Sequence, residues 1–239
     1  EESFVSGSRA ALAGGTTSFI CFKPQWRGQT LAQSAPDYET RAARSLADYS
    51  FHQIITDPTP EVLATEIPAL AARGIRSLKV FLTYDPLRLT DGDFLKVLAS
   101  ARRLGLLVTV HCENFDAIAW QQEALLAAGL TDPVHHAWAR PPVVEREATV
   151  RAMALAELVD QPLQIFHVSC EEVAEEVARA KARGQKVWAE TCTHYLTHGV
   201  DDLERPDFEG AKFVCSPALR DRSEAARLWE AIRAGTIDI

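Results

Sequence analysis

A lysine and two histidines occupy comparable places in three apolar segments of the chain. Lys79 lies within "RSLKVFLTY" (76–84), His111 closes the apolar part of "LLVTVHCE", and His167 closes that of "PLQIFHVS". If these segments are parallel strands of a barrel, their carboxyl ends converge on one face, where active sites form. Two neutral imidazoles and one anionic group there would suit zinc or a similar divalent ion.

Lys79 is an unusual residue for an interior strand. A buried amine is costly in its charged form and tends to lose its proton. A neutral amine can react with carbon dioxide to give a carbamate, which is an anionic, carboxylate-like metal ligand. The alternative is an edge strand whose lysine reaches outward into water.

Other polar residues fall near these three. Tyr84 would lie above the metals, where its phenol could polarise a carbonyl or hold a developing oxyanion. Glu113 and Asn114 directly follow His111 and could orient it, although they could equally be polar loop residues. Ser216, in "VCSPALRD", could present backbone groups to a polar ring. A role for Ser216 as nucleophile has no support, since the chain has no GxSxG motif.

The elements that must position these residues alternate along the chain. Strands are expected at 16–22, 51–57, 77–84, 106–113, 162–169, 186–193 and 211–217, with 235–239 opening another, and helices at 59–74, 91–105 and 169–184. This alternation predicts a parallel sheet with crossover helices, covered on both faces. A doubly wound sheet and a (β/α)8 barrel both fit, but no GxGxxG turn follows the first strand, which disfavours a dinucleotide-binding fold. The most irregular stretches, 23–50 and 114–145, are expected to be loops.

The composition is that of an ordinary globular domain. The chain has 239 residues, 47% of them hydrophobic and 24% charged, which suits one α/β barrel domain over residues 1–239 or two smaller domains. The net charge of −8 disfavours a nucleic-acid partner. No apolar run is long enough to predict a membrane span. Five cysteines without a CxxC pair indicate reduced thiols and a cytoplasmic protein.

Several blocks of the sequence resemble one enzyme family, in order and over essentially the whole chain. The blocks are "ALAGGTTSFICF", "SLKVFLTY", "VTVHCEN", "HAWARPPVVEREATVRAMALAE", "IFHVSCEE", "AETCTHYL" and "FEGAKFVCSPALRD". They are similar to the hydantoinase/dihydropyrimidinase branch of the cyclic amidohydrolases. The resemblance implies a (β/α)8 TIM-like barrel of the metal-dependent amidohydrolase superfamily, usually a homotetramer. It also implies hydrolytic opening of a small cyclic amide or imide, a hydantoin or a dihydropyrimidine, to an N-carbamoyl amino acid.

The same resemblance implies roles for particular residues. Two divalent metal ions, most often Zn2+, would be bridged by Lys79 in its N6-carboxylated form. His111 and His167 would hold the second metal. Tyr84 would contact the substrate and stabilise the oxyanion, and Ser216 would bind the cyclic imide through its backbone.

Part of the family's metal site has no counterpart in the chain. The family holds its first metal with an HxH pair on the first strand, and the chain has no HxH. A further metal ligand, an aspartate that is also the general base, would come just after Ile239. We therefore expect an internal piece of a barrel, without the first strand and the end of the last, and inactive by itself.

Two alternative functions stay open at this point. A dihydroorotase or allantoinase would share the fold, but a dihydroorotase should carry an arginine and an asparagine for the substrate carboxylate, with no clear equivalent in the chain. A non-catalytic, dihydropyrimidinase-like scaffold protein would typically lose metal ligands, whereas Lys79, His111 and His167 are present.

Overall fold

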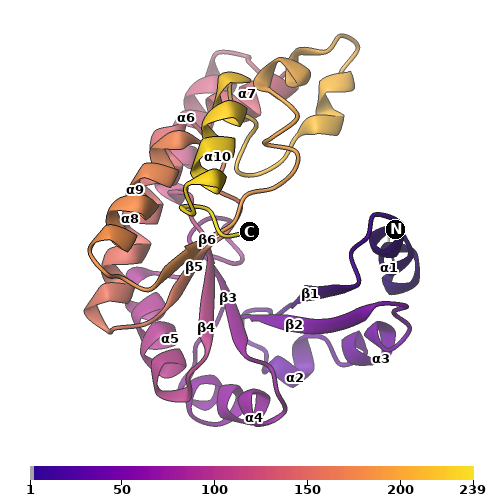
Figure 1. Cartoon of the computed structure of the whole chain (residues 1–239), viewed down its shortest axis with the longest axis vertical. Coiled ribbons are helices and arrows are strands. Elements are labelled where there is room, and N and C mark those ends of the chain that lie inside the picture. The colour runs from indigo at the N-terminus through magenta and orange to yellow at the C-terminus, as the bar shows by residue number, and fades with distance from the viewer. Residues whose placement is uncertain (1–2) are drawn as a thin grey trace.

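The computed structural model describes residues 3–239 and is built around a parallel sheet (Figure 1). Six strands follow one another across the sheet in the order of the sequence, and each neighbouring pair is parallel. They are β1 (Ser18–Lys23), β2 (Asp48–Ile54), β3 (Ser77–Phe81), β4 (Leu107–His111), β5 (Leu163–Ile165) and β6 (Val187–Ala189). The predicted α/β class and parallel sheet are therefore confirmed.

Helices occupy the connections between the strands, and α4, α5, α8 and α9 lie along one side of the curved sheet (Figure 1). The α-helices are α1 (Phe4–Ala13), α2 (Leu31–Ser34), α3 (Tyr38–Ala42), α4 (Ile67–Ala72), α5 (Asp91–Leu104), α6 (Phe115–Ala127), α7 (Pro133–Trp138), α8 (Pro142–Leu158), α9 (Glu171–Ala182) and α10 (Ser223–Arg233). A π-helical turn, η1 (Val62–Glu66), precedes α4, and two 3₁₀ helices, η2 (Val200–Glu204) and η3 (Glu209–Phe213), follow β6.

Helix α5 shows how local sequence sets the elements that carry the site. The Thr90 hydroxyl accepts a hydrogen bond from the backbone N–H of Asp93, which caps the first turn. Gly105, with φ of 64°, ends the helix in the left-handed conformation that glycine adopts without strain. The chain then enters β4, whose register with β3 places His111 beside Phe81.

Residues 211–217 do not form the strand that their composition predicts. The segment contains η3 and then irregular chain. The available edge of β6 is used by the C-terminal residues, because the N–H groups of Asp238 and Ile239 both donate to the carbonyl oxygen of Ala189. The expected strand at 235–239 is also absent as an assigned element, although its last residues run beside β6.

The stretch 114–145 is also more regular than the sequence indicates. It contains α6, α7 and the first turn of α8. Within α6 only Ile118 is fully buried. The helix therefore lacks the broad apolar face whose periodicity would predict a helix from the sequence.

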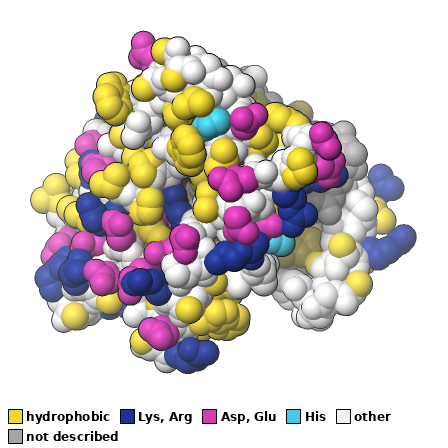
Figure 2. Space-filling view, turned by 90° about the horizontal axis from the view of Figure 1, so that it is seen from above, with side chains coloured by type: hydrophobic (Ala, Val, Ile, Leu, Met, Phe, Trp, Pro, Cys, Tyr) yellow, Lys and Arg dark blue, Asp and Glu magenta, His cyan; other side chains and the backbone are white. Residues whose placement is uncertain are grey.

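The surface agrees with the composition. Acidic and basic side chains are intermixed on the face shown in Figure 2, and no basic stripe of the kind that binds nucleic acid crosses that face. Within residues 3–239, no helix combines the length and the apolar character needed to cross a bilayer. All five cysteines are free thiols.

The contact between η3 and η2 predicts a large effect for one small substitution. A Cβ atom at Gly210 would lie 2.1 Å from the carbonyl oxygen of Leu203. Gly210→Ala should therefore lower the free energy of unfolding by about 1–3 kcal/mol, as measured by urea denaturation. Gly92→Ala is the matched control, because the nearest atom to its Cβ would be the Thr90 hydroxyl at 3.9 Å. Equal stability of the two variants would contradict this account.

Candidate active site

Lys79 lies within β3 and is almost completely buried, with 1% of its surface exposed. Its Nζ is 4.0 Å from the centroid of the Phe166 ring and 4.9 Å from that of Phe81. Among the described residues it has no hydrogen-bond partner. Burial lowers the pKa of Lys79 to about 7, because the ammonium form loses its hydration. The burial predicted from the sequence is confirmed, and the alternative of an outward-reaching lysine is wrong.

His111 and His167 come together at the carboxyl ends of β4 and β5. Their ring centroids are 4.4 Å apart, and His111 is 2% exposed. Burial lowers the pKa of both imidazoles well below the usual range, and the nearby Lys79 ammonium lowers both further. Both rings are therefore neutral at pH 7 and keep a lone pair. The predicted convergence of the two histidines is confirmed, and the Lys79 amine is near enough for its charge to lower both pKa values.

Glu113 contacts the His111 ring, which is one of the two roles that the sequence leaves open. The Nε2–H of His111 donates to Oε2 of Glu113 over 2.6 Å, which leaves the lone pair on Nδ1. Asn114 does not share this role. Its side-chain oxygen accepts from the N–H of Ala117 at the start of α6, and its amide nitrogen donates to Glu147. The expectation that Asn114 orients His111 is corrected: its side chain caps a helix.

Tyr84 packs against His111, and Ser216 lies near Tyr84. The Tyr84 ring centroid is 5.1 Å from that of His111, and the residue holds a left-handed backbone with φ of 66°. Burial raises the pKa of the Tyr84 phenol, and the nearby Ser216 side chain acts in the opposite direction. The structure thus brings Tyr84 next to the histidine pair and Ser216 next to Tyr84.

Lys79, His111 and His167 would suit a metal ion if the lysine were carboxylated. Nζ of Lys79 and Nδ1 of His167 are both buried and have no partner among the described residues. Within residues 3–239 no group of three or more His, Cys, Asp and Glu side chains is arranged to hold a metal ion. Two histidines and an unmodified amine are a weak ligand set, whereas addition of carbon dioxide would make the amine an anionic oxygen donor.

The site geometry is accompanied by extensive similarity to known proteins. The chain is 46% identical to a D-hydantoinase of Ralstonia pickettii and 44% identical to one of Rhizobium radiobacter, over 99% of this chain and 52% of each relative. The solved structure of a dihydropyrimidinase from Brevibacillus agri is 40% identical and superimposes with a TM-score of 0.96, over 99% of this chain and 52% of that one.

The chain is homologous to D-hydantoinases and dihydropyrimidinases. It spans about half the length of these relatives. No family model matches it.

Four further charged or polar residues of this hydantoinase homologue form a buried layer that the sequence does not reveal. Arg220 and Glu145 make an ion pair of 2.8 Å in which the side chains are 6% and 2% exposed. Ser169 accepts from Nε of Arg220 and donates from both its N–H and its hydroxyl to Glu145. Arg140 receives a bond from Arg220 at its carbonyl oxygen, and its own guanidinium lies 3.6 Å from Glu113.

This layer joins distant parts of the hydantoinase homologue and reaches Glu113, the hydrogen-bond partner of His111. Arg220 and Glu145 are separated by 75 positions in the chain, so no local pattern links them. The only available signal is chemical, because an arginine and a glutamate inside apolar segments must be paired if they are buried.

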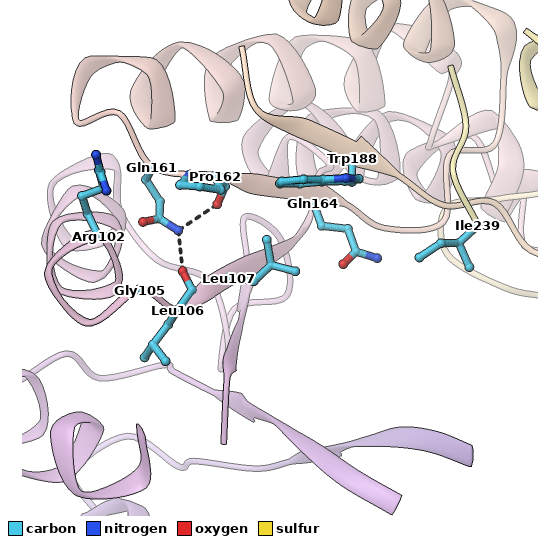
Figure 3. A pocket seen from close by; sticks show the side chains of 9 residues that line it. All are labelled: Arg102, Gly105, Leu106, Leu107, Gln161, Pro162, Gln164, Trp188 and Ile239. Atoms are coloured by element: carbon cyan, nitrogen blue, oxygen red, sulfur yellow. Dashed lines mark hydrogen bonds between the residues drawn. The ribbon is translucent and has the colours of Figure 1, made fainter. Parts of the chain in front are cut away.

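A separate cavity of about 440 Å³ lies at the opposite, amino ends of the strands (Figure 3). It is lined by Leu107 at the start of β4, by Gln164 within β5 and Trp188 within β6, and by the Gln161 amide, which donates to the carbonyl oxygens of Leu106 and Pro162 over 2.8 Å. None of the predicted site residues lines this cavity. We assign it no part in the chemistry of the hydantoinase homologue.

The buried ion pair leads to a stability prediction. Arg220→Met should lower the free energy of unfolding by about 3–5 kcal/mol, because it leaves the Glu145 carboxylate buried without its charge partner. Arg102→Met is the control, since the Arg102–Asp160 pair is exposed and such pairs contribute about 0–1 kcal/mol. Both values come from denaturant unfolding curves. A loss for Arg220→Met no larger than the control loss would contradict the prediction.

Proposed function

We propose that the complete protein containing this chain is a metal-dependent cyclic amidohydrolase that opens hydantoin or dihydropyrimidine rings. The observation that supports this most is the buried amine of Lys79, without a partner in the described residues, beside two neutral histidines. Homology to proteins named D-hydantoinase and dihydropyrimidinase supports the substrate class.

Lys79, His111 and His167 would hold the metal in this proposal. Lys79 would be carboxylated on Nζ and bridge two divalent ions, and the chemistry of imidazole and carboxylate-like ligands favours zinc. When bound, such ions lower the pKa of water towards ~7 and polarise a carbonyl group. The HxH pair with which the family holds its first metal has no counterpart within residues 1–239.

The other residues of the chain would orient the substrate and stabilise charge. Water adds to a ring carbonyl carbon, the bond from that carbon to the ring nitrogen breaks, and the nitrogen gains a proton, which yields an N-carbamoyl amino acid. Tyr84 would donate its phenol proton to the oxygen that becomes negative during the addition. The backbone of Ser216 would bind the polar edge of the ring, and Glu113 would hold the proton of His111 on Nε2.

The same proposal extends to the architecture of the complete protein. Six parallel strands in sequential order are compatible with part of a (β/α)8 barrel, and the complete protein would close it. We also propose a homo-oligomer, a tetramer as in the family. Large exposed apolar side chains on α6 and at the end of α8, such as Trp120 at 69% and Leu158 at 73%, are compatible with burial against other subunits.

Substitution of Lys79 tests the proposal directly. Lys79→Met in the complete protein keeps an unbranched, buried side chain against the phenylalanine rings, so the fold should persist. Hydrolysis of hydantoin and dihydrouracil should fall to background, and bound zinc should fall from about two ions per chain. With ¹³C-bicarbonate, ¹³C NMR should show a carbamate signal in the wild type only.

Lys96→Met is the matched control for that experiment. Lys96 is exposed and pairs with Asp93 within α5, so its loss should change neither activity nor metal content. Full activity of Lys79→Met, or a carbamate signal that persists in it, would refute the bridging role.

The hydrogen bond between Glu113 and His111 predicts an effect on metal affinity. Glu113→Leu removes the group that holds the His111 ring, and it should weaken zinc binding about 10- to 100-fold in a competition titration with a chelator. Glu147→Leu is the control, because Glu147 is half-exposed and contacts Asn114 and Arg151. Unchanged zinc affinity in Glu113→Leu would show that His111 needs no such support.

A further inference from the structure

Ser216 lies between two backbone carbonyl groups that are held by side chains from other elements. The Tyr195 hydroxyl donates to the carbonyl oxygen of Pro217 over 2.6 Å. On the other side of Ser216, Nε2 of His136 lies 2.9 Å from the carbonyl oxygen of Cys215. A carbonyl oxygen only accepts, so both side chains must be the donors. Each neighbour of Ser216 is therefore fixed by a hydrogen bond from outside its own segment.

The backbone groups of Ser216 itself are not used in this way. Among residues 3–239, its N–H and its carbonyl oxygen make no hydrogen bond, and the residue is only partly buried. Backbone groups that are withdrawn from water normally have a partner, because an unpaired group costs about as much as a lost hydrogen bond. A donor and an acceptor on one residue are the chemical complement of the N–H and C=O groups of a cyclic amide.

Tyr195 is suited to a lasting structural bond and unsuited to proton transfer. It is 4% exposed, and its N–H donates to the carbonyl oxygen of Cys192 in the turn that follows β6. Its hydroxyl hydrogen is already donated to Pro217, and burial raises the pKa of the phenol well above its usual range. The phenol therefore stays protonated at pH 7 and donates to the same oxygen throughout.

The chain that follows Ser216 is anchored as well. The N–H of Val200 donates to the carbonyl oxygen of Arg220 over 2.7 Å. Ala218 and Leu219 are buried, with 0% and 2% of their surface exposed. These anchors fix one end of the segment, and the two carbonyl bonds fix the part that contains Ser216.

We propose that Tyr195, together with His136, is a positioning residue: the two side chains hold the carbonyl groups on either side of Ser216, so that the N–H and carbonyl of Ser216 bind the amide edge of the substrate ring. Recognition of the ring rests on the proposed function, whereas the two hydrogen bonds do not. In this role neither side chain touches a reacting atom, and each acts through the backbone of Ser216.

The first experiment reads the Tyr195 bond without any substrate. In the complete protein labelled with ¹³C-carbonyl proline and ¹⁵N-alanine, the Pro217–Ala218 peptide bond gives one NMR cross-peak, assigned by its loss in Ala218→Gly. Tyr195→Phe should move the Pro217 carbonyl signal to lower frequency, because a hydrogen bond deshields the carbonyl carbon that accepts it. The Pro68–Ala69 bond in α4 has the same residue pair and should not move. An unchanged Pro217 signal would overturn the proposal whatever the enzyme hydrolyses.

The His136 bond is read in the same way with a different pair of labels. Within residues 1–239, only Cys215–Ser216 joins a cysteine carbonyl to a serine amide. His136→Phe should move the Cys215 carbonyl signal to lower frequency, and Tyr195→Phe should leave it nearly unchanged. A Cys215 signal that does not respond to His136→Phe would overturn the part of the proposal that concerns His136.

The second experiment measures hydrolysis of hydantoin by the complete protein. Tyr195→Phe should raise KM about 5- to 10-fold and change kcat less than about twofold, because Ser216 would bind the ring before the chemical step as well as during it. General destabilisation would instead lower kcat through loss of active protein and leave KM unchanged, and that result would overturn the proposal. Tyr49→Phe is the control, because Tyr49 loses the same hydroxyl in β2, where it is 37% exposed, and should change neither constant.

Methylated rings test whether the effect passes through Ser216. 1-Methylhydantoin and 3-methylhydantoin, used as competitive inhibitors of hydantoin hydrolysis, each lack one of the two ring N–H groups. The ring without the N–H that Ser216 binds should have affinities for wild type and Tyr195→Phe within about twofold, whereas the other ring should lose about as much affinity as hydantoin does.

Equal weakening of both methylated rings by Tyr195→Phe would overturn the proposed route through Ser216. Wild-type protein that opens neither hydantoin nor dihydrouracil would refute the proposed function alone, because the carbonyl signals would still decide the hydrogen-bond assignment.

Discussion

Exclusion of water from the carboxyl ends of β3, β4 and β5 determines the chemistry of this region. The same burial acts on every ionisable group there and favours the neutral form of each. Burial lowers the pKa of Lys79 to about 7 and lowers those of His111 and His167 well below the usual histidine range. It raises the pKa values of the Glu113 carboxyl and the Tyr84 phenol. A group that must act as a nucleophile towards carbon dioxide, or as a metal ligand, needs its lone pair, and desolvation supplies that state without any neighbouring base.

Desolvation also requires a charge partner for each buried arginine in the layer formed by Arg140, Glu145, Ser169 and Arg220. A guanidinium does not lose its proton, so Arg140 and Arg220 stay charged where they are buried and each needs an anionic partner. Arg220 has Glu145 at 2.8 Å, and Arg140 has Glu113 at 3.6 Å. The two guanidinium groups are linked, because Arg220 donates to the carbonyl oxygen of Arg140. Arg220 and Glu145 thus form a buried charge pair linked to Arg140, whose guanidinium opposes the effect of burial on the pKa of Glu113.

Sequence reasoning succeeded where the relevant information is periodic and local. Lys79, His111 and His167 were found because apolar strands and helices with glycine stops reveal a parallel sheet, whose carboxyl ends meet. The strand expected at 211–217 is wrong because its composition competes with a non-local fact: the edge of β6 is occupied by Asp238 and Ile239. The residues of 211–217 themselves contain no pattern that shows that another segment pairs with the edge of β6.

The residues that sequence reasoning missed share a different property. His136, Arg140, Glu145 and Arg220 act through partners on other elements, so their types alone do not show what they do. Asn114 illustrates the converse, since its position next to His111 and Glu113 suggested a role in the site, while its side chain is used to cap α6. In a short polar segment after a strand, helix capping and support of a catalytic group use the same residue types, and only the direction of the side chain separates them.

Backbone strain gives an independent indication that this region is held for function. Tyr84 and His167, with φ of 66° and 45°, adopt the left-handed conformation that disfavours side chains larger than glycine. Both follow the ends of strands, and both present a ring to His111, with centroids 5.1 and 4.4 Å from it. Such conformations persist only where the surrounding packing over-determines them. Phe81 packs against Tyr84 and Phe166 against His167, and the same two rings lie next to the Lys79 amine. The cost in backbone energy is therefore compensated by burial, and three rings on three separate chain segments are fixed in one place.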